Sequence, residues 1–462
     1  MARDPQSPRF DPWSVDFPVG PGRWPFFYGW LLMGGSALGM LASMPGQTIG
    51  FSVFIEILMA ELELTRDEIS LSYMVGTIVS GLTLPYGGTL LDRFGVRKSM
   101  VAASAGLGCI CLYFSQIDHI ANGLGSLLRF ATPGLVAWLT VCLGFYCIRF
   151  TGQGMMALSA TTMLGKWFNN RRGLALGLRG VISALGFSLT PLVLNGLLEA
   201  IGWRQSYWVL AATCGFGMAL LAYIFYRDNP EECGLEMDGG YVPAGGKPKT
   251  DDLVIYRDYT RAEALRTFSY WVYSSSLCLH SFLITGFAFH VVSIGETLRM
   301  EDNRILALFL PITCISIPTN LLFGWLSDRT RLRYLLMVMT LAQVLTGFSF
   351  LFLPGIVGEG LLIIGMGVSS GGFVSLSGVF FPRYFGRRHL GAINGFHLSS
   401  AVISSALGPI VFSRIFTEMS SYSPSFYVAG TVALALFLCS FFAHNPQRKG
   451  GKPGGRGQER EE

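Results

Sequence analysis

Charged side chains inside apolar stretches are the residues of this chain best placed to do chemistry. Arg149 lies in the apolar stretch 134–165, about sixteen residues, or roughly 24 Å of helix, from each polar end. A charge at that depth is costly and normally faces a bundle interior or an aqueous cavity. Because guanidinium groups pair with carboxylates in bidentate fashion, Arg149 predicts a binding site for an organic anion. The alternative is a structural arginine that binds nearby carbonyl groups.

Arg179 is a second candidate for the same positive pocket. It follows Arg172 by only seven residues, about 10 Å along a helix, so its side chain could also reach the interface by snorkelling. Anion binding and packing both stay open for this residue.

Histidines in apolar stretches could carry a proton, because imidazole titrates near neutral pH. The alternative for each is a packing role. Acidic residues are absent deep in these stretches, so a proton would be carried by a histidine or by the ligand itself. The histidines concerned are His280, His290 and His397.

Neutral polar residues supply further candidate contacts. Pro45 breaks the hydrogen-bond ladder of its helix, and polar neighbours can satisfy the freed carbonyl groups or line a cavity. Gln47 and Thr48 are therefore candidate substrate contacts. Three weaker candidates, each also explained by a hydrogen bond between helices, are Tyr73, Asn320 and Asn394.

The elements that position these residues are predicted to be transmembrane helices. Of the 462 residues, 51% are hydrophobic and only 14% are charged, with a mean hydropathy of +0.47, whereas a soluble protein has about 25% charged residues. Spanning the hydrocarbon core takes roughly 20 apolar residues. Twelve stretches qualify: 27–58, 68–91, 99–118, 134–165, 173–199, 204–226, 269–296, 304–326, 333–353, 358–381, 391–416 and 424–443.

Arginine and lysine gather in alternate loops, which predicts that these loops and both termini face the cytoplasm. The net charge of +5 follows from this topology and requires no nucleic-acid partner. We expect a monomer in a lipid bilayer, by default the plasma (inner) membrane of a bacterium. The nine cysteines form no disulfide or metal-ligand pattern, and we predict no cofactor.

A Gly-x-x-x-Asp-Arg pattern occurs twice, in both cases between two apolar stretches. Glycine allows two helices to pack closely, and an aspartate at a helix end can pair with an arginine or with a neighbouring helix N-terminus. We therefore predict a charged latch that closes one face. The residues are Gly88, Asp92, Arg93, Gly95 and Arg97 in the first copy and Gly324, Asp328 and Arg329 in the second.

These two motifs resemble the loop signatures between helices 2 and 3 and between helices 8 and 9 of the major facilitator superfamily. The resemblance implies an all-α membrane protein with twelve transmembrane helices in two six-helix repeats. Within that superfamily, residues 27–30, 166–177, 202–204, 229–235 and 384–387 look like the monocarboxylate and oxalate/formate transporter branch. The stretch 306–325 departs from this branch, because it lacks the charged residue that usually holds the substrate carboxylate in helix 8.

The predicted organisation has two bundles joined by a polar linker. The segments are a cytoplasmic N-terminal segment (1–25), an N-terminal six-helix bundle (26–226), a cytoplasmic linker (227–268), a C-terminal six-helix bundle (269–445) and a disordered cytoplasmic tail (446–462).

The function predicted from these features is secondary active transport of a small organic anion, monocarboxylate-like, by rocking of the two halves around a central site. Coupling to protons is left open. The alternatives are efflux of another metabolite or drug and, from a different class, a nontransporting membrane sensor. An enzyme is disfavoured because no nucleophile and base pair or metal cluster appears at membrane depth.

Overall fold

The protein is described by a computed structural model that covers residues 12–127, 132–241, 255–300 and 302–447, and every regular element of the described chain is a helix. Its tail after residue 447 and the middle of its predicted linker lie outside the described residues. The first group of helices is α1 (Gly29–Ala42), α2 (Thr48–Phe51), α3 (Ile55–Leu62), α4 (Arg66–Phe94), α5 (Val96–Ser115), α6 (Ile117–Leu127), α7 (Pro133–Ile148), η4 (Arg149–Met156), α8 (Ala157–Trp167), α9 (Arg172–Ile201), α10 (Trp203–Leu210), η5 (Ala211–Gly217) and α11 (Met218–Phe225).

The second group follows the linker. It consists of α12 (Arg261–Leu265), α13 (Phe268–Thr297), α14 (Asp302–Ala307), α15 (Phe309–Ser327), α16 (Leu332–Phe348), α17 (Ile356–Phe385), α18 (Leu390–Met419) and α19 (Ser423–Ser440). Short 3-10 turns occur at Pro21–Arg23, Met44–Gly46, Ser52–Phe54, Glu231–Cys233, Met237–Gly240 and Ser349–Leu351.

Eleven helices in the described part of the chain are long and apolar enough to cross a membrane, and α1 is a shorter apolar helix. The runs α7–η4–α8 and α10–η5–α11 are each continuous and contain a π-helical segment, η4 or η5. The predicted all-α membrane fold is confirmed.

The first predicted span differs from the structure. The stretch predicted at 27–58 is broken: α1 ends at Ala42, a 3-10 turn holds Met44–Gly46, and only short helical pieces follow up to Leu62. Pro45 explains the break, because proline lacks a backbone N–H and cannot continue an α-helix without losing a hydrogen bond.

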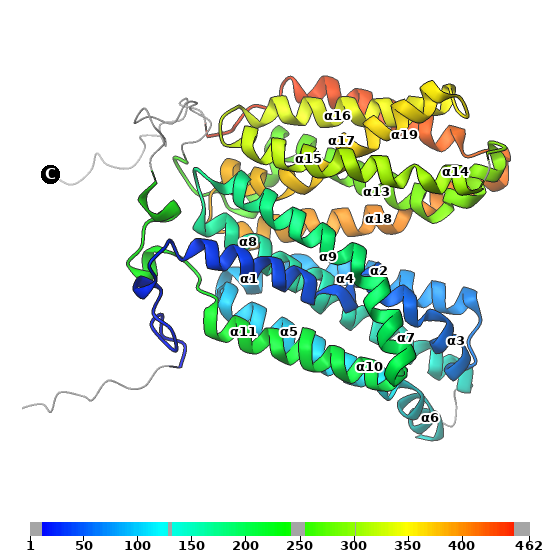
Figure 1. The fold of residues 1–462 in the computed structure, drawn as a ribbon, viewed down its shortest axis with the longest axis horizontal. Coiled ribbons are helices and arrows are strands. Elements are labelled where there is room, and N and C mark those ends of the chain that lie inside the picture. Colours follow the sequence, from blue (N-terminus) through cyan, green and yellow to red (C-terminus); the bar gives the residue numbers. More distant parts are fainter. Residues whose placement is uncertain (1–11, 128–131, 242–254, 301, 448–462) are drawn as a thin grey trace, which may run out of the picture.

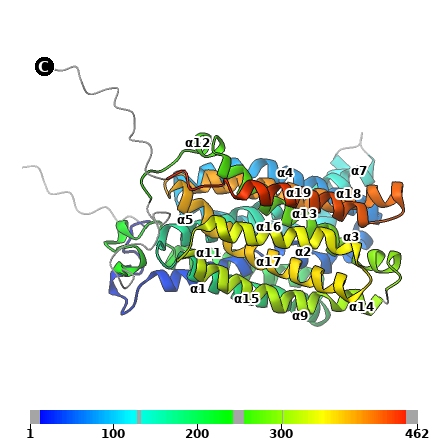
Figure 2. The same ribbon diagram turned by 90° about the horizontal axis from the view of Figure 1, so that it is seen from above.

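The two groups of helices form two bundles that lie against each other, with α1–α11 in the lower part of Figure 1 and α13–α19 in the upper part. In both views the helices run along the same long axis (Figures 1 and 2). Across the interface α4 packs on α18, and α9 packs on α15 and α17. Glycines allow this closeness: a Cβ on Gly88 would collide with the carbonyl group of Gly391, and one on Gly173 with that of Gly324.

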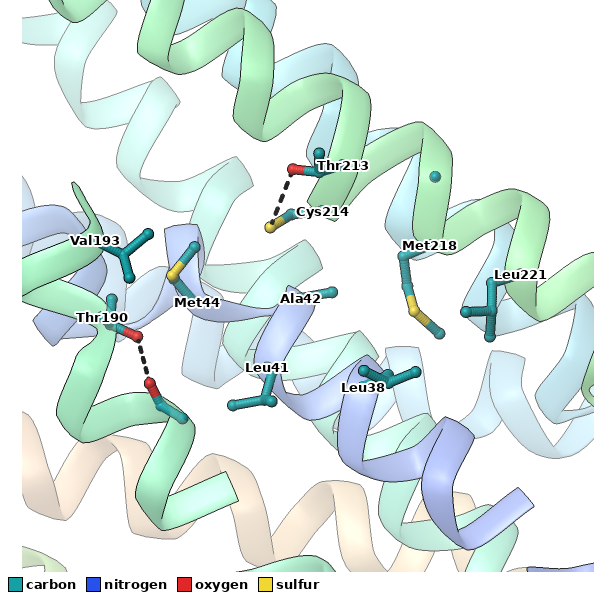
Figure 3. A pocket seen from close by; sticks show the side chains of 12 residues that line it. Leu38, Leu41, Ala42, Met44, Thr190, Val193, Thr213, Cys214, Met218 and Leu221 are labelled. Carbon is teal, nitrogen blue, oxygen red and sulfur yellow. Dashed lines mark hydrogen bonds between the residues drawn. The ribbon is translucent and has the colours of Figure 1, made fainter. Parts of the chain in front are cut away.

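A crevice opens within the first bundle, between α1, α9 and the run η5–α11 (Figure 3). Its volume is about 350 Å³ and its walls are almost entirely apolar.

An ion pair fixes α6 beside α10. Asp118 accepts hydrogen bonds from both terminal nitrogens of Arg204, at 2.8 and 2.7 Å. Those bonds lower the pKa of Asp118 to about 2, from an ordinary value of about 3.9. A carboxylate with a lowered pKa stabilises the fold fully above its unfolded pKa and stops doing so as the pH falls through its folded pKa.

We therefore predict that Asp118→Asn lowers the free energy of unfolding by roughly 1 kcal/mol at pH 7. The difference between variant and wild type should shrink as the pH falls from about 4 to about 2. Thermal unfolding of the purified protein checks this. A difference that stays constant over that pH range would show that the charge of Asp118 contributes nothing.

Candidate functional site

Two aspartates cap helices of the opposite bundle at one end of the molecule, which we call the latch end. Asp92, at the end of α4, accepts hydrogen bonds from the backbone N–H groups of Gly391 and Ala392 in α18, both at 2.7 Å. Asp328, just after α15, accepts from Gly173 at 2.9 Å and Leu174 at 3.2 Å in α9. Helix N-termini attract negative charge, so each cap holds the two bundles together.

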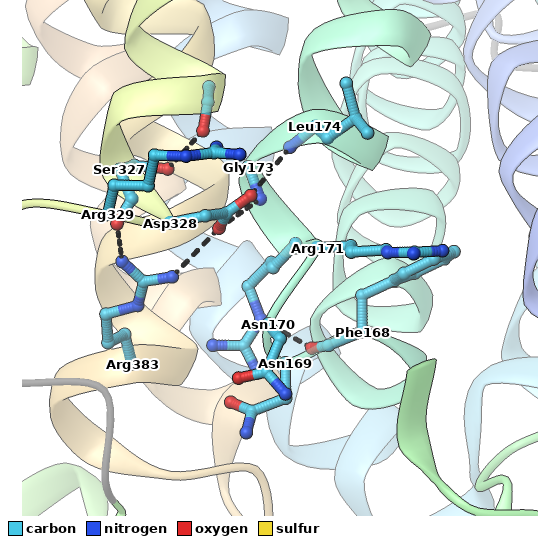
Figure 4. A network of polar contacts seen from close by, with 12 residues as sticks. Phe168, Asn169, Asn170, Arg171, Gly173, Leu174, Ser327, Asp328, Arg329 and Arg383 are labelled. Carbon is cyan, nitrogen blue, oxygen red and sulfur yellow. Dashed lines mark hydrogen bonds and ion pairs between the residues drawn. The ribbon is translucent and has the colours of Figure 1, made fainter. Parts of the chain in front are cut away.

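Arg383 adds an ion pair to the cap at Asp328 (Figure 4). Its guanidinium group lies 3.1 Å from the carboxylate of Asp328 and donates to the carbonyl of Ser327. Burial raises the pKa of Asp328, and the charge of Arg383 and the hydrogen bonds from α9 act against that rise.

Of the remaining predicted latch residues, Gly88 and Gly324 lie at the contact between the bundles, whereas the other four have partners in their own half of the chain. Arg93 and Arg329 stack on their neighbours, with the guanidinium carbon 5.5 Å from the ring centre of Phe94 and 4.1 Å from that of Trp325, respectively. Gly95 has a φ of 86°, a conformation that favours glycine, and lies against the carboxylate of Asp228.

Arg97 fixes the N-terminal segment rather than the other bundle. It donates to the carbonyl groups of Trp13 at 3.2 Å, Ser14 at 3.0 Å and Phe17 at 2.8 Å. Arg227 binds the same segment, at the carbonyl groups of Val15, Phe17 and Val19.

Linker residues complete the latch end, and their contacts were not predicted from the sequence. Asp238 accepts from the N–H groups of residues 169–171 before α9, and Asp258 accepts from Arg387 and Arg388 before α18. Arg387 also crosses between the bundles, donating to the carbonyl of Lys166 and to Glu231, both at 2.8 Å. The sequence signal for these contacts was the basic loop that precedes both α9 and α18. The acidic residues that bind these loops lie far away in the sequence, so the sequence did not indicate which residues pair.

Arg149 lies at the junction of α7 and η4, buried beside the break in the first span. Only 4% of its surface is exposed. Its guanidinium group donates to the carbonyl of Gly46 at 3.2 Å and to the Thr48 hydroxyl at 3.4 Å, and lies 5.2 Å from the ring centre of Tyr73. The Thr48 and Tyr73 hydroxyl oxygens are 2.5 Å apart. Gln47 directly precedes Thr48, and its side chain donates to the Ser43 hydroxyl at 3.1 Å. The structure therefore places four predicted site residues close together here: Arg149, Gln47, Thr48 and Tyr73.

Arg179 has a different partner. It donates to the Thr161 hydroxyl at 2.9 Å, and Thr161 lies twelve residues after Arg149 in the run η4–α8, about 18 Å along the helix. Arg179 is therefore held much closer to the latch end than Arg149.

The candidates in the second bundle are also spread along its length. His280 packs against the ring of Phe373, with centroids 5.0 Å apart, and His397 binds the Ser274 hydroxyl at 2.9 Å. Asn320 donates to the carbonyl of Gly177 at 3.1 Å and so joins α15 to α9. Asn394 is buried in α18, only a few residues from the cap at Asp92.

Two bundles closed at one end by reciprocal helix caps, with a buried cation between that end and the other, define a membrane transporter architecture. The family model of the Major Facilitator Superfamily matches residues 31–371. The chain belongs to this superfamily, whose members carry small molecules across membranes.

Known proteins similar to this chain include carriers of organic anions. The probable sulfoacetate transporter SauU of Cupriavidus necator is 24% identical, covering 87% of this chain and 93% of the relative. Human monocarboxylate transporter 6 is 31% identical over a shorter region, 37% of this chain and 31% of the relative. The crystal structure of the human organic anion transporter MFSD10 has a TM-score of 0.57 at 16% identity, covering 89% of this chain and 98% of that one, and shows the same fold.

The helix caps make a direct prediction about exchange of backbone amides. Replacing Asp92 by Asn should weaken the two hydrogen bonds at the start of α18, because it removes a negative charge from the helix N-terminus, a charge worth about 0.3 to 2 kcal/mol there. Asp328→Asn should do the same at the start of α9. Hydrogen–deuterium exchange should accelerate in the corresponding helix start for each variant.

Asp118→Asn is the matched control, since it removes the same charge away from the latch end. Exchange at Gly391 and Ala392 that stays at the wild-type rate in Asp92→Asn would show that the cap does not hold α18.

Proposed function

We propose that the chain transports a small organic anion of monocarboxylate type by alternating access, with Arg149 as the group that binds the anion. The observation that carries this proposal is an uncompensated buried charge. The partners of Arg149 are a neutral carbonyl, a hydroxyl and an aromatic ring. Its Nε has no hydrogen-bond partner, and none of the ion pairs among the described residues includes Arg149.

A buried charge needs an opposite charge or full hydrogen bonding to offset its desolvation. A bound carboxylate supplies both, because it can accept two hydrogen bonds from one guanidinium group. Gln47, Thr48 and Tyr73 then provide neutral contacts to the rest of a small substrate. The names of the relatives, which include sulfoacetate, monocarboxylate and organic anion transporters, support the same chemical class.

The closed latch end supports a direction of access. Arg149 lies eighteen residues from the end of α8, about 27 Å away. We propose that the latch end faces the cytoplasm of a plasma membrane, with both termini on that side, and that the anion reaches Arg149 from the opposite side in this state. Arg179, Asn320, Asn394 and His397 lie nearer the latch end and would meet the anion after the caps release.

Uptake into liposomes tests the proposal. Purified protein should take up radiolabelled lactate, pyruvate, formate or oxalate, and Arg149→Ala should lower uptake about 10- to 100-fold, because charge-assisted hydrogen bonds worth about 1.5 to 3 kcal/mol are lost. Arg149→Lys should retain part of the activity.

Arg414→Ala is the control, because Arg414 is an exposed arginine paired with Glu418 one turn away. Equal uptake by wild type, Arg149→Ala and empty liposomes for all four anions would contradict the assignment of substrate class.

Proton coupling is a separate part of the proposal. His280 is buried in α13 against Phe373, and acidic side chains are absent deep in the apolar stretches, so we assign the coupled proton to this imidazole. An inward proton gradient should stimulate uptake in wild type, and His280→Gln should abolish the stimulation while leaving anion exchange without a gradient intact. His119→Gln, at an exposed histidine, should behave as wild type. Stimulation that survives in His280→Gln would assign the proton to the substrate or to His397.

A further inference from the structure

The apolar crevice in the first bundle is built from three helical runs at membrane depth (Figure 3). Its volume of about 350 Å³ falls within the range of small-molecule pockets, about 300 to 1,000 Å³. Its lining includes Leu41, Ala42, Met44, Val193 and Met218.

The polar atoms of the crevice are already used within their own helices. The Thr190 hydroxyl donates to the carbonyl of Gly186 at 3.1 Å, and the Thr213 hydroxyl donates to that of Val209 at 2.7 Å. The lining contains no charged side chain. An occupant therefore gains only apolar contact and needs no hydrogen-bonding group of its own.

The crevice is continuous with the apolar outer surface of the bundle. Val193, which lines it, is 59% exposed, and large apolar side chains beside it on α9 and α11 are similarly exposed, among them Leu189 and Leu220. In a membrane-spanning bundle such a surface faces lipid, whose chains are as apolar as leucine. The apolar lining and the opening toward lipid therefore both favour the same occupant, one acyl chain of a membrane lipid.

The crevice also adjoins the break in the first span. Ala42 and Met44 line it, and the carbonyl of Met44 accepts from the N–H of Gln47 at 2.9 Å. Two residues after Met44, the carbonyl of Gly46 holds Arg149. The same short turn therefore contacts the crevice on one side and supports the arginine on the other.

We propose that this crevice binds a single lipid acyl chain and that the bound chain supports the turn at Met44–Gly46, which positions Arg149. The claim that the crevice binds an acyl chain rests on the crevice itself and is independent of transport. The effect on the anion rests on the proposed function.

Photo-crosslinking tests the binding part without any transport. Phosphatidylcholine vesicles would contain a phosphatidylcholine with a diazirine in the middle of one acyl chain, and labelled residues would be mapped by peptide mass spectrometry. We expect labelling of Leu41 and Met218 to exceed that of the surface residues Leu189 and Leu220 several-fold. Ala42→Phe, which fills the crevice, should abolish that excess.

Ala212→Phe is the matched control, because Ala212 lies on the same membrane-facing run as the crevice wall but outside its lining. It should keep the excess. Even labelling of crevice and surface in wild type, or an excess that survives in Ala42→Phe, would overturn the proposal. If Ala42→Phe is not monodisperse, Val193→Trp at the mouth of the crevice replaces it.

The effect on the anion is tested with lipids whose chains are too wide to enter. Vesicles of diphytanoyl phosphatidylcholine, with methyl-branched chains, should raise the KM for the transported anion in wild type relative to straight-chain vesicles. Ala42→Phe should be insensitive to the change of lipid. An identical KM in both lipids would overturn the coupling while leaving the crosslinking result intact, and absence of any anion uptake would count against the proposed function alone.

Discussion

The bundles depend on one kind of interaction, a carboxylate of one bundle placed at the N-terminus of a helix in the other. Asp92 of the first bundle caps α18 of the second, and Asp328 of the second bundle caps α9 of the first. A charge at a helix end is worth about 0.3 to 2 kcal/mol. Moving a two-state equilibrium from 1:99 to 99:1 takes about 5.5 kcal/mol. Two such caps therefore bias the closed state without locking it, as the proposed alternating access requires.

Close backbone approach is the condition for those caps. Gly88 meets Gly391 and Gly173 meets Gly324, with no room for a Cβ in either pair. The glycine and the aspartate of each motif thus act together, since a larger residue would separate the helices and lengthen the bonds to the aspartate. This explains why the motif contains both residues at fixed spacing on one helix.

The sequence was sufficient for the helical class, the positions of most spans and the two aspartate motifs, because apolar length and a repeated polar signature are local properties. It did not reveal which N–H groups the aspartates bind, because Asp92 and Gly391 are 299 residues apart. The contacts of Arg383, Asp238 and Asp258 were missed for the same reason. The break near Pro45 was recognisable from one residue, but the grouping of Gly46, Thr48 and Tyr73 around Arg149 needed the fold.

The two caps are similar in design but differ in the cation that supports each carboxylate. Asp328 has Arg383 at ion-pair distance. The residue at the corresponding place before α9 is Lys166, and its carbonyl group is bound by Arg387 from the second bundle. Asp328 is thus held by an arginine of its own bundle as well as by α9, whereas the charge of Lys166 acts on Asp92 and Arg387 adds a partly exposed pair with Glu231. Exposed pairs contribute little, about 0 to 1 kcal/mol. The Arg383–Asp328 pair lies within the second bundle, so it orients the carboxylate toward α9 and need not break when the bundles separate.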